Sequence, residues 1–168
     1  MSQTNELEIM ERIALDLERV EESLASSFNT GAEDFNALIR PLSAAGGKRL
    51  RAQLCLLIAN AGTSIERQRI KIAEAVEMLH LATLIHDDVL DQAEIRRGED
   101  TIHMHKGNKV AILSGDYLFA KAFKIVSEMT NMKYLQVFSH IITCLVEGEF
   151  MQMEDVYRID QGIERYLS

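Results

Sequence analysis

Three aspartates and two arginines lie close together in the middle of this 168-residue sequence. The motif His86-Asp87-Asp88-Val89-Leu90-Asp91 ends an apolar stretch, and Arg96-Arg97-Gly98 follows it. On a helix, Asp87 and Asp91 share one face and Asp88 flanks them. Carboxylates suit Mg²⁺, which commonly completes its ligands with phosphate oxygens, and arginine binds phosphate bidentately. The two motifs together predict a site for a magnesium-bridged diphosphate.

A second basic motif, Gly46-Gly47-Lys48-Arg49-Leu50-Arg51, precedes another apolar run. Adjacent glycines let a backbone approach a ligand closely, and a helix N-terminus attracts anions. Lys48 and Arg51 are three residues apart and can share a face. Taken alone, the motif fits a solvated turn better than a ligand site. It gains weight as an anion site only beside the aspartates.

The longest helical pattern runs from Ile65 to about Ala93 and carries the aspartates at its end. Counting back from Asp87 by four and seven residues places Thr83 and His80 on the same stripe. A lone histidine on a helix is more often structural than functional. Because His80 is aligned with the carboxylates, both readings stay open.

The remaining sequence predicts helices throughout, with one proline and nine glycines in the chain. We expect helices over residues 6–24, around 35–42 with Pro41 near the end, over 111–129 with an interruption at Gly115-Asp116, and over 135–157. Residues 98–108 are predicted to form a polar link, in which His103 and His105 are structural rather than a metal pair. The fold class is therefore all-α, in one domain with a sizeable core.

Composition excludes several functional classes. The net charge of −8 argues against nucleic acid as the main partner. No apolar run approaches the length of a membrane span, and the N-terminal residues are too acidic for a signal or transit peptide. Cys55 and Cys144 lie in apolar surroundings and are expected to be buried, reduced thiols. These features predict a cytoplasmic protein.

These motifs resemble the trans-type polyprenyl diphosphate synthases, most closely the bacterial medium- and long-chain, heptaprenyl-type enzymes. The resemblance rests on the order and spacing of motifs from the first helix to the chain's end: Gly46 to Arg51, Asp87 to Asp91, Arg96-Arg97-Gly98, Thr101-Ile102-His103, Gly107-Asn108, Gly115-Asp116 and Gly148-Glu149 with Gln152. It implies an all-α, isoprenoid-synthase-type helical bundle, of which this chain is the N-terminal part, with a deep cavity between helices.

The resemblance also implies roles for particular residues. Asp87, Asp88 and Asp91 would bind Mg²⁺ and, through it, an allylic diphosphate that Arg96 also contacts. Isopentenyl diphosphate would be held by four further residues, namely Lys48, Arg51, His80 and Arg97. Gln152 would lie near the allylic group. Ionisation of the allylic diphosphate and attack by isopentenyl diphosphate would then need electrostatic help rather than a side-chain base.

The residues before Asp87 bear on the length of the product. In the family, bulky aromatics four or five residues before this motif close the cavity early, whereas Thr83 and Ala82 stand here. The resemblance therefore implies a medium or long product, with Leu79 or Val76 as a later stop, and a geranylgeranyl-length product as the alternative. Replacement of Ala82 by Phe is expected to shorten the product.

Three departures from the family pattern are visible. Ala52 and Asp100 stand where many members have proline, which loosens a local turn without removing a ligand. The third is larger, since a second Asp-Asp-x-x-Asp motif is absent from these 168 residues. We expect the chain to be the N-terminal portion of a synthase, inactive alone and associating as a dimer through the helices over 111–157.

Two other readings stay open. One is a non-catalytic or regulatory subunit of a two-chain synthase, and the expected dependence on a small partner subunit is likewise undecided. The intact Asp, Arg and Lys motifs argue against a purely structural role, because like charges held together are costly. The other is a helical interaction module with a solvated acidic patch.

Overall fold

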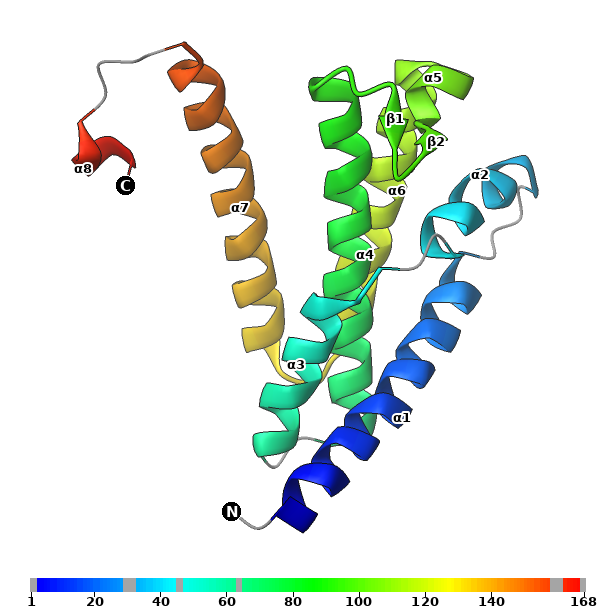
Figure 1. The fold of residues 1–168 in the computed structure, drawn as a ribbon, viewed down its shortest axis with the longest axis vertical. Coiled ribbons are helices and arrows are strands. Elements are labelled where there is room, and N and C mark those ends of the chain that lie inside the picture. Colours follow the sequence, from blue (N-terminus) through cyan, green and yellow to red (C-terminus); the bar gives the residue numbers. More distant parts are fainter. Residues whose placement is uncertain (1–2, 29–32, 45–46, 63–64, 158–161, 167–168) are drawn as a thin grey trace. The chain divides into compact units, whose positions relative to one another are not determined.

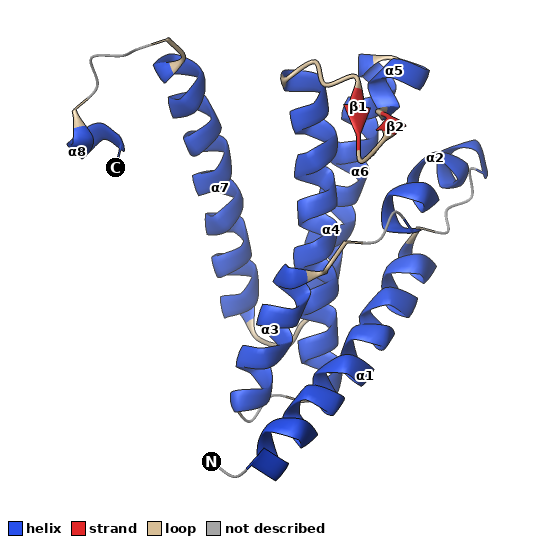
Figure 2. Ribbon diagram, in the orientation of Figure 1, coloured by secondary structure: helices blue, strands red, loops and turns tan. Residues whose placement is uncertain are grey.

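The computed structural model describes residues 3–28, 33–44, 47–62, 65–157 and 162–166. Helices dominate them, as Figure 2 shows, which confirms the predicted all-α class. The chain forms two units, residues 1–130 and residues 131–168. The first contains α1 (Gln3–Ser27), α2 (Glu33–Ala44), α3 (Leu50–Ala61), α4 (Glu66–Leu90), α5 (Ile102–Lys106) and α6 (Asn108–Ser127), together with a short hairpin.

Helix α4 is the centre of the first unit (Figure 1). It packs most extensively against α6 and also contacts α1 and α3. Small and medium apolar residues on α4, among them Ala75, Met78 and Ala82, are fully buried. Close packing of this kind brings helix backbones near one another, so α4 offers a rigid support for the aspartates at its end.

A buried ion pair and hydrogen bonds to a second buried carboxylate join α1 to α4. Asp16 on α1 is 1% exposed, and Arg69 donates two hydrogen bonds to it, with Nε 2.6 Å from Oδ2. Glu74 on α4 is completely buried and accepts hydrogen bonds from Ser23 and Ser27 on α1, each at 2.7 Å. Lys71, one helical turn earlier on α4, also donates to Glu74 at 2.7 Å. Both buried carboxylates are thus compensated, as a buried charge requires.

The segment between α4 and α6 contains structure that the sequence pattern did not predict. Strands β1 (Ile95–Arg96) and β2 (Glu99–Asp100) pair antiparallel, with Arg96 opposite Glu99. Arg97 and Gly98 form the turn with φ of 54° and 86°, and two positive φ values are what a two-residue type I′ turn requires. Helix α5 follows at once. Strands of two residues carry no readable alternation, so the sequence pattern did not predict this hairpin.

Helix α6 was predicted to be interrupted at Gly115-Asp116, and this prediction was also wrong. The helix is continuous, and Gly115 is buried in it. A Cβ atom at position 115 would lie 2.2 Å from Nε2 of His86 on α4. The glycine therefore allows α4 and α6 to approach each other closely.

The second unit consists of α7 (Met132–Asp155) and α8 (Ile163–Tyr166). Asn131 begins α7 as an N-cap, since its side chain accepts a hydrogen bond from the backbone N–H of Lys133. Cys144 on α7 is exposed, whereas Cys55 on α3 is partly buried. Both cysteines are free, but the expectation that both are buried was wrong.

Candidate diphosphate-binding site

The aspartate cluster, defined as Asp87, Asp88 and Asp91, occupies the C-terminal end of α4. Asp91 is the exposed C-cap residue, and its backbone N–H donates to the Asp87 carbonyl oxygen at 2.8 Å. A helix C-terminus carries partial negative charge. Three carboxylates therefore lie at the negative end of the helix dipole, and the last turn of α4 itself has no basic residue. Such an arrangement favours a bound cation.

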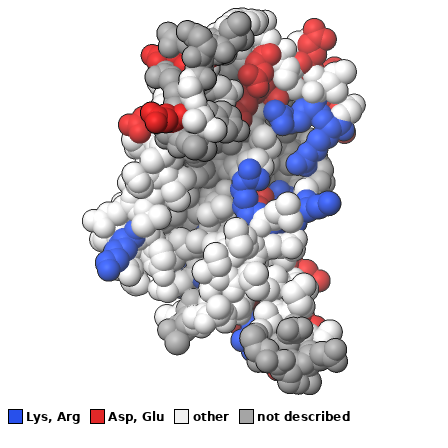
Figure 3. All heavy atoms as spheres, turned by 60° about the vertical axis from the view of Figure 1, so that its left-hand side comes forward, with Lys and Arg blue, Asp and Glu red and all other residues white. Residues whose placement is uncertain are grey.

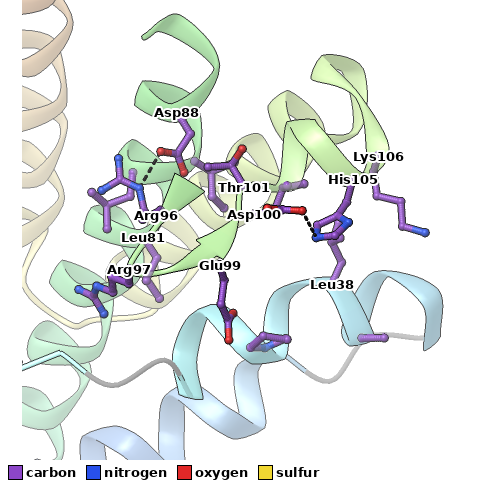
Figure 4. Close-up of a pocket in the computed structure, with 15 residues that line it drawn as sticks. Leu38, Leu81, Asp88, Arg96, Arg97, Glu99, Asp100, Thr101, His105 and Lys106 are labelled. Atoms are coloured by element: carbon purple, nitrogen blue, oxygen red, sulfur yellow. Dashed lines mark hydrogen bonds and ion pairs between the residues drawn. The ribbon is translucent and has the colours of Figure 1, made fainter. Parts of the chain in front are cut away.

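Asp88 differs from the other two aspartates because an arginine compensates it. Its side chain is only 10% exposed, and Nε of Arg96 donates to its Oδ1 at 2.7 Å. Figure 4 shows Arg96 reaching from the hairpin to Asp88, while the neighbouring Arg97 points away from this pair. The hairpin therefore separates the two adjacent arginines and ties one of them to the aspartate cluster.

A pocket of about 750 Å³ opens beside this ion pair. Helices α2, α4 and α5 and the hairpin line it, with Leu81, Leu84 and Asp88 supplied by α4. Arg96 and Arg97 also line it, but the other predicted site residues do not. The pocket thus adjoins the aspartate cluster on a neighbouring face of α4.

The oxygen-only donor set of the aspartate cluster fits Mg²⁺ chemically. Among the residues that the structure describes, no three His, Cys, Asp or Glu side chains converge closely enough to hold a metal ion. Mg²⁺ usually binds through one or two carboxylates and keeps water or substrate oxygens as its other ligands. Asp87 and Asp91 can meet that requirement, and Asp88 is held by Arg96.

The basic cluster, defined as Lys48, Arg51, His80 and Arg97, is assembled from three separate segments. Nη1 of Arg51 on α3 lies 3.0 Å from Nε2 of His80 on α4. On the loop before α3, a Cβ atom at Gly47 would lie 3.3 Å from the guanidinium of Arg97. Lys48 follows Gly47 and is exposed. Gly46, the other glycine of this motif, lies outside the described residues.

His80 is held in its neutral form by this environment. Partial burial lowers its pKa below the ordinary value of 6.5, and the positive charges of Arg51, Arg97 and Arg96 lower it further against the opposing effect of Glu77. Because Arg51 has only N–H donors, Nε2 of His80 must be the acceptor in their contact. The N–H on Nδ1 is then the donor that His80 has to offer.

Arg49 belongs to the same basic motif but plays a different part. It is 7% exposed, in a left-handed conformation with φ of 45°, and donates two hydrogen bonds to Glu21 on α1 at 2.6 and 3.1 Å. Glu77 on α4 lies 3.5 Å from its Nη1. Arg49 therefore anchors the loop, while Lys48 and Arg51 on either side of it remain exposed.

His86, next to the aspartate cluster, packs against α6. Its Nε2 lies 3.1 Å from the Ile112 carbonyl oxygen and 3.5 Å from Oδ1 of Asp116, and its ring contacts Phe119 at 5.5 Å. His103 is hydrogen-bonded to Thr101 at 3.0 Å, which agrees with the structural role predicted for it. Neither contact was readable from spacing alone.

The four residues predicted to set product length are buried to different degrees. Ala82 is completely buried and Leu79 is 6% exposed, whereas Thr83 and Val76 are partly exposed. Thr83 donates from its hydroxyl to the His80 carbonyl oxygen at 2.9 Å. Gln152 is exposed on α7 in the second unit. The roles of these five residues stay predictions.

Basic side chains gather in one part of the surface that Figure 3 shows, although the chain as a whole carries a net charge of −8. Clustered cations of this kind attract an anion locally. The model of the family described as "Polyprenyl synthetase" matches residues 32–168, which include both clusters. The chain belongs to the polyprenyl synthetase family.

Named relatives and solved structures of this polyprenyl synthetase support the assignment. Heptaprenyl diphosphate synthase component 2 of Geobacillus stearothermophilus is 39% identical over 90% of this chain and 48% of its own length. A geranylgeranyl pyrophosphate synthase from Lactobacillus brevis superposes with a TM-score of 0.88 at 32% identity, over 93% of this chain and 49% of that one.

A third comparison concerns ligands. The crystal structure of a Caulobacter crescentus polyprenyl synthase, complexed with calcium and isoprenyl diphosphate, superposes with a TM-score of 0.87 at 33% identity. The superposition covers 95% of this chain and 48% of that one. The polyprenyl synthetase described here thus spans about half the length of the relatives that it matches. Among its described helices, none is both long and apolar enough to span a membrane.

Proposed function

We propose that this chain supplies the first diphosphate-binding half of a prenyltransferase that condenses an allylic diphosphate with isopentenyl diphosphate. The observation that carries the proposal is that two clusters with opposite charge meet the C-terminal half of α4, with Asp87 to Asp91 at its end and His80 two turns earlier. The aspartate cluster would bind a cation, whereas the basic cluster would bind an anion directly, without a metal ion between them. Two diphosphates, one bridged by metal and one held by arginine, match this pair.

The allylic substrate belongs at the aspartate cluster. Asp87 and Asp91 would hold Mg²⁺, which supplies neutralisation of charge on the leaving diphosphate when bound. In the contact described above, Arg96 donates to Asp88 through Nε. A guanidinium carries further N–H donors that can bind a phosphate oxygen. The binding of calcium and isoprenyl diphosphate by the related Caulobacter crescentus protein supports this assignment.

Isopentenyl diphosphate belongs at the basic cluster. Lys48, Arg51 and Arg97 provide positive charge, and neutral His80 provides an N–H donor. Held there, the double bond of isopentenyl diphosphate can attack the allylic carbon as the C–O bond breaks. The cation left on the isopentenyl unit then loses a proton to form the new double bond, and the departing diphosphate takes up that proton. The protein's contribution is positional and electrostatic, so a dedicated side-chain base is not needed.

We further propose a medium- or long-chain product, since Thr83 and Ala82, four and five residues before Asp87, are not bulky aromatic residues. The heptaprenyl name of the Geobacillus stearothermophilus relative supports this length, whereas the Lactobacillus brevis neighbour supports the geranylgeranyl alternative. The word "component" in the former name also supports a partner subunit. Dimerisation, Gln152 near the allylic group and a cytoplasmic location remain predictions.

The proposal is tested by following labelled isopentenyl diphosphate into prenyl products with an allylic primer and Mg²⁺. The natural protein that carries this sequence, at its full length, should make products longer than geranylgeranyl diphosphate. No incorporation would contradict the proposed activity, and a geranylgeranyl product would support the alternative length. Turnover by the 168 residues alone would contradict the proposal that they supply only half of the site.

A further inference from the structure

Two contacts hold the start of α3 against α4. In the first, the backbone N–H of Ala52 donates to Oε1 of Glu77 at 3.0 Å, in a buried contact. In the second, Arg51 contacts His80, three residues after Glu77 on α4. Because Arg51 and Ala52 are neighbours, the hydrogen bond between Ala52 and Glu77 also restrains the position of Arg51.

Glu77 acts as an N-terminal cap of α3. The N-cap residue, Arg49, has no side-chain hydrogen bond that caps this helix. The N–H groups of a first helical turn need an acceptor when they are buried, and Ala52 is completely buried. Glu77 provides that acceptor from another helix, and its second oxygen, Oε2, faces Arg49 at 3.5 Å.

The charges around Glu77 separate the basic motif into two parts. Arg49 is enclosed by Glu77 and Glu21, so its charge is compensated within the fold. Lys48 and Arg51 flank Arg49 in the sequence and stay at the surface. A buried carboxylate thus contacts Arg49, the buried cation of this motif, while Lys48 and Arg51 are exposed.

We propose that Glu77 is a positioning residue for isopentenyl diphosphate, holding Arg51, His80 and the Gly47-Lys48 loop in the arrangement that binds its diphosphate. The inference rests on the proposed function of the basic cluster. Glu77 itself is 3% exposed, so it would act through the residues that it holds and not by contact with the ligand. Its removal weakens binding because small displacements of a preorganised polar site are costly.

The chain offers a matched control for this inference. Glu74 lies three residues earlier on α4 and is also a buried, compensated carboxylate, but it binds Ser23, Ser27 and Lys71 rather than the loop. Glu77→Gln and Glu74→Gln make the same chemical change at similar burial. Both should lower the free energy of unfolding, whereas only Glu77→Gln should affect the basic cluster.

The test is a calorimetric titration of the 168-residue chain with isopentenyl diphosphate in EDTA, without Mg²⁺. Omitting the metal isolates the basic cluster from the aspartate cluster. The parent chain and Glu74→Gln should bind alike, and Glu77→Gln should bind roughly tenfold more weakly. In parallel, NMR titration should show a lower pKa for His80 in Glu77→Gln only, since Glu77 opposes the lowering by the arginines.

Each outcome decides between the inference and the proposal beneath it. Equal affinity of Glu77→Gln and the parent would overturn the positioning role and leave the site intact. Equal weakening by both variants would also overturn it, because general destabilisation would then suffice. No binding by the parent would overturn the proposed function as well. If Glu77→Gln does not fold, Arg49→Lys tests the same anchor and should weaken binding in the same direction.

Discussion

The aspartate cluster and the basic cluster are held in place by different means. A single helix presents Asp87 and Asp91, and their alignment follows from helical spacing alone. The basic cluster joins a loop, α3, α4 and the hairpin turn, and buried ion pairs of Arg49 hold it. A local motif therefore tolerates changes in distant packing, whereas an assembled one depends on it.

The largest expected effect separates the two clusters by their ligands. Asp87→Asn should reduce Mg²⁺-dependent affinity for an allylic diphosphate by about 100-fold, because it removes a metal ligand and a charge. Affinity for isopentenyl diphosphate in EDTA should not change. Calorimetry measures both, with Asp34→Asn at an exposed position on α2 as the control. A parallel loss of both affinities would show that the clusters are not independent.

Packing below the aspartate cluster gives the next effect. Ala82→Phe should lower the free energy of unfolding by about 2.5 kcal/mol, because Ala82 is completely buried and over-packing is costly. Thr83→Phe, on a partly exposed position, should cost less than about 1 kcal/mol. Urea unfolding of each chain measures the difference. Equal stabilities would contradict the assignment of these two faces of α4.

The different burial of positions 82 and 83 also refines the test of product length. An aromatic residue at position 82 combines over-packing with any block of the cavity, so a shorter product would have two explanations. At position 83 the side chain is partly exposed, and an aromatic residue acts mainly as a block. Thr83→Phe in the full-length protein should shorten the product, as measured by chromatography of its prenyl chains. An unchanged length would contradict the path along this face.

Contact between α4 and α6 provides a smaller effect. Gly115→Ala should destabilise the chain by about 2 kcal/mol, since its Cβ would overlap the His86 ring. Gly148→Ala on α7 is the matched control, because nothing lies within 4 Å of its Cβ position. That change should stabilise its helix by up to about 1 kcal/mol. Opposite signs in urea unfolding are expected, and a neutral Gly115→Ala would contradict the close approach.

The smallest effect concerns pH and the basic cluster. The pKa of His80 is lower in the folded chain than its ordinary value of 6.5, mainly through burial and then through Arg51. The unfolded chain therefore binds the proton more readily, so stability is fully present above about 6.5 and falls as the pH drops toward the folded pKa. His80→Gln should reduce this loss in unfolding measured from pH 7.5 to 5. An unchanged pH dependence would contradict the neutral role of His80.

The same contrast explains what the sequence could reveal. Helices α1, α4 and α7 and the alignment of Asp87 with Asp91 follow from short-range periodicity, and they are confirmed near their predicted bounds. The pairing of Arg49 with Glu21 joins residues far apart in the sequence, and no local pattern encodes it. Gly115 suggested an interruption of α6 because glycine disfavours a helix. The reason for glycine at this position is the close approach of His86, which lies on another helix. Partner choice across helices was the missing information.

The hairpin shows a second limit of sequence reading. Arg96 and Arg97 look equivalent as neighbours in Arg-Arg-Gly, yet the turn directs Arg96 to Asp88 and places Arg97 beside Gly47. Gly98 with its positive φ was the available signal for this turn. A non-glycine residue at the other positive-φ position hid the pattern, since Asn or Gly is usual there.

The central claim is that the C-terminal half of α4 helps to bind two diphosphates by two different means. The most direct test titrates the 168-residue chain with an allylic diphosphate and, separately, with isopentenyl diphosphate, each in EDTA and in Mg²⁺. The account predicts that Mg²⁺ raises affinity for the allylic diphosphate by at least about tenfold and leaves that for isopentenyl diphosphate unchanged. Equal dependence of both ligands on Mg²⁺, or independence of both, would contradict it.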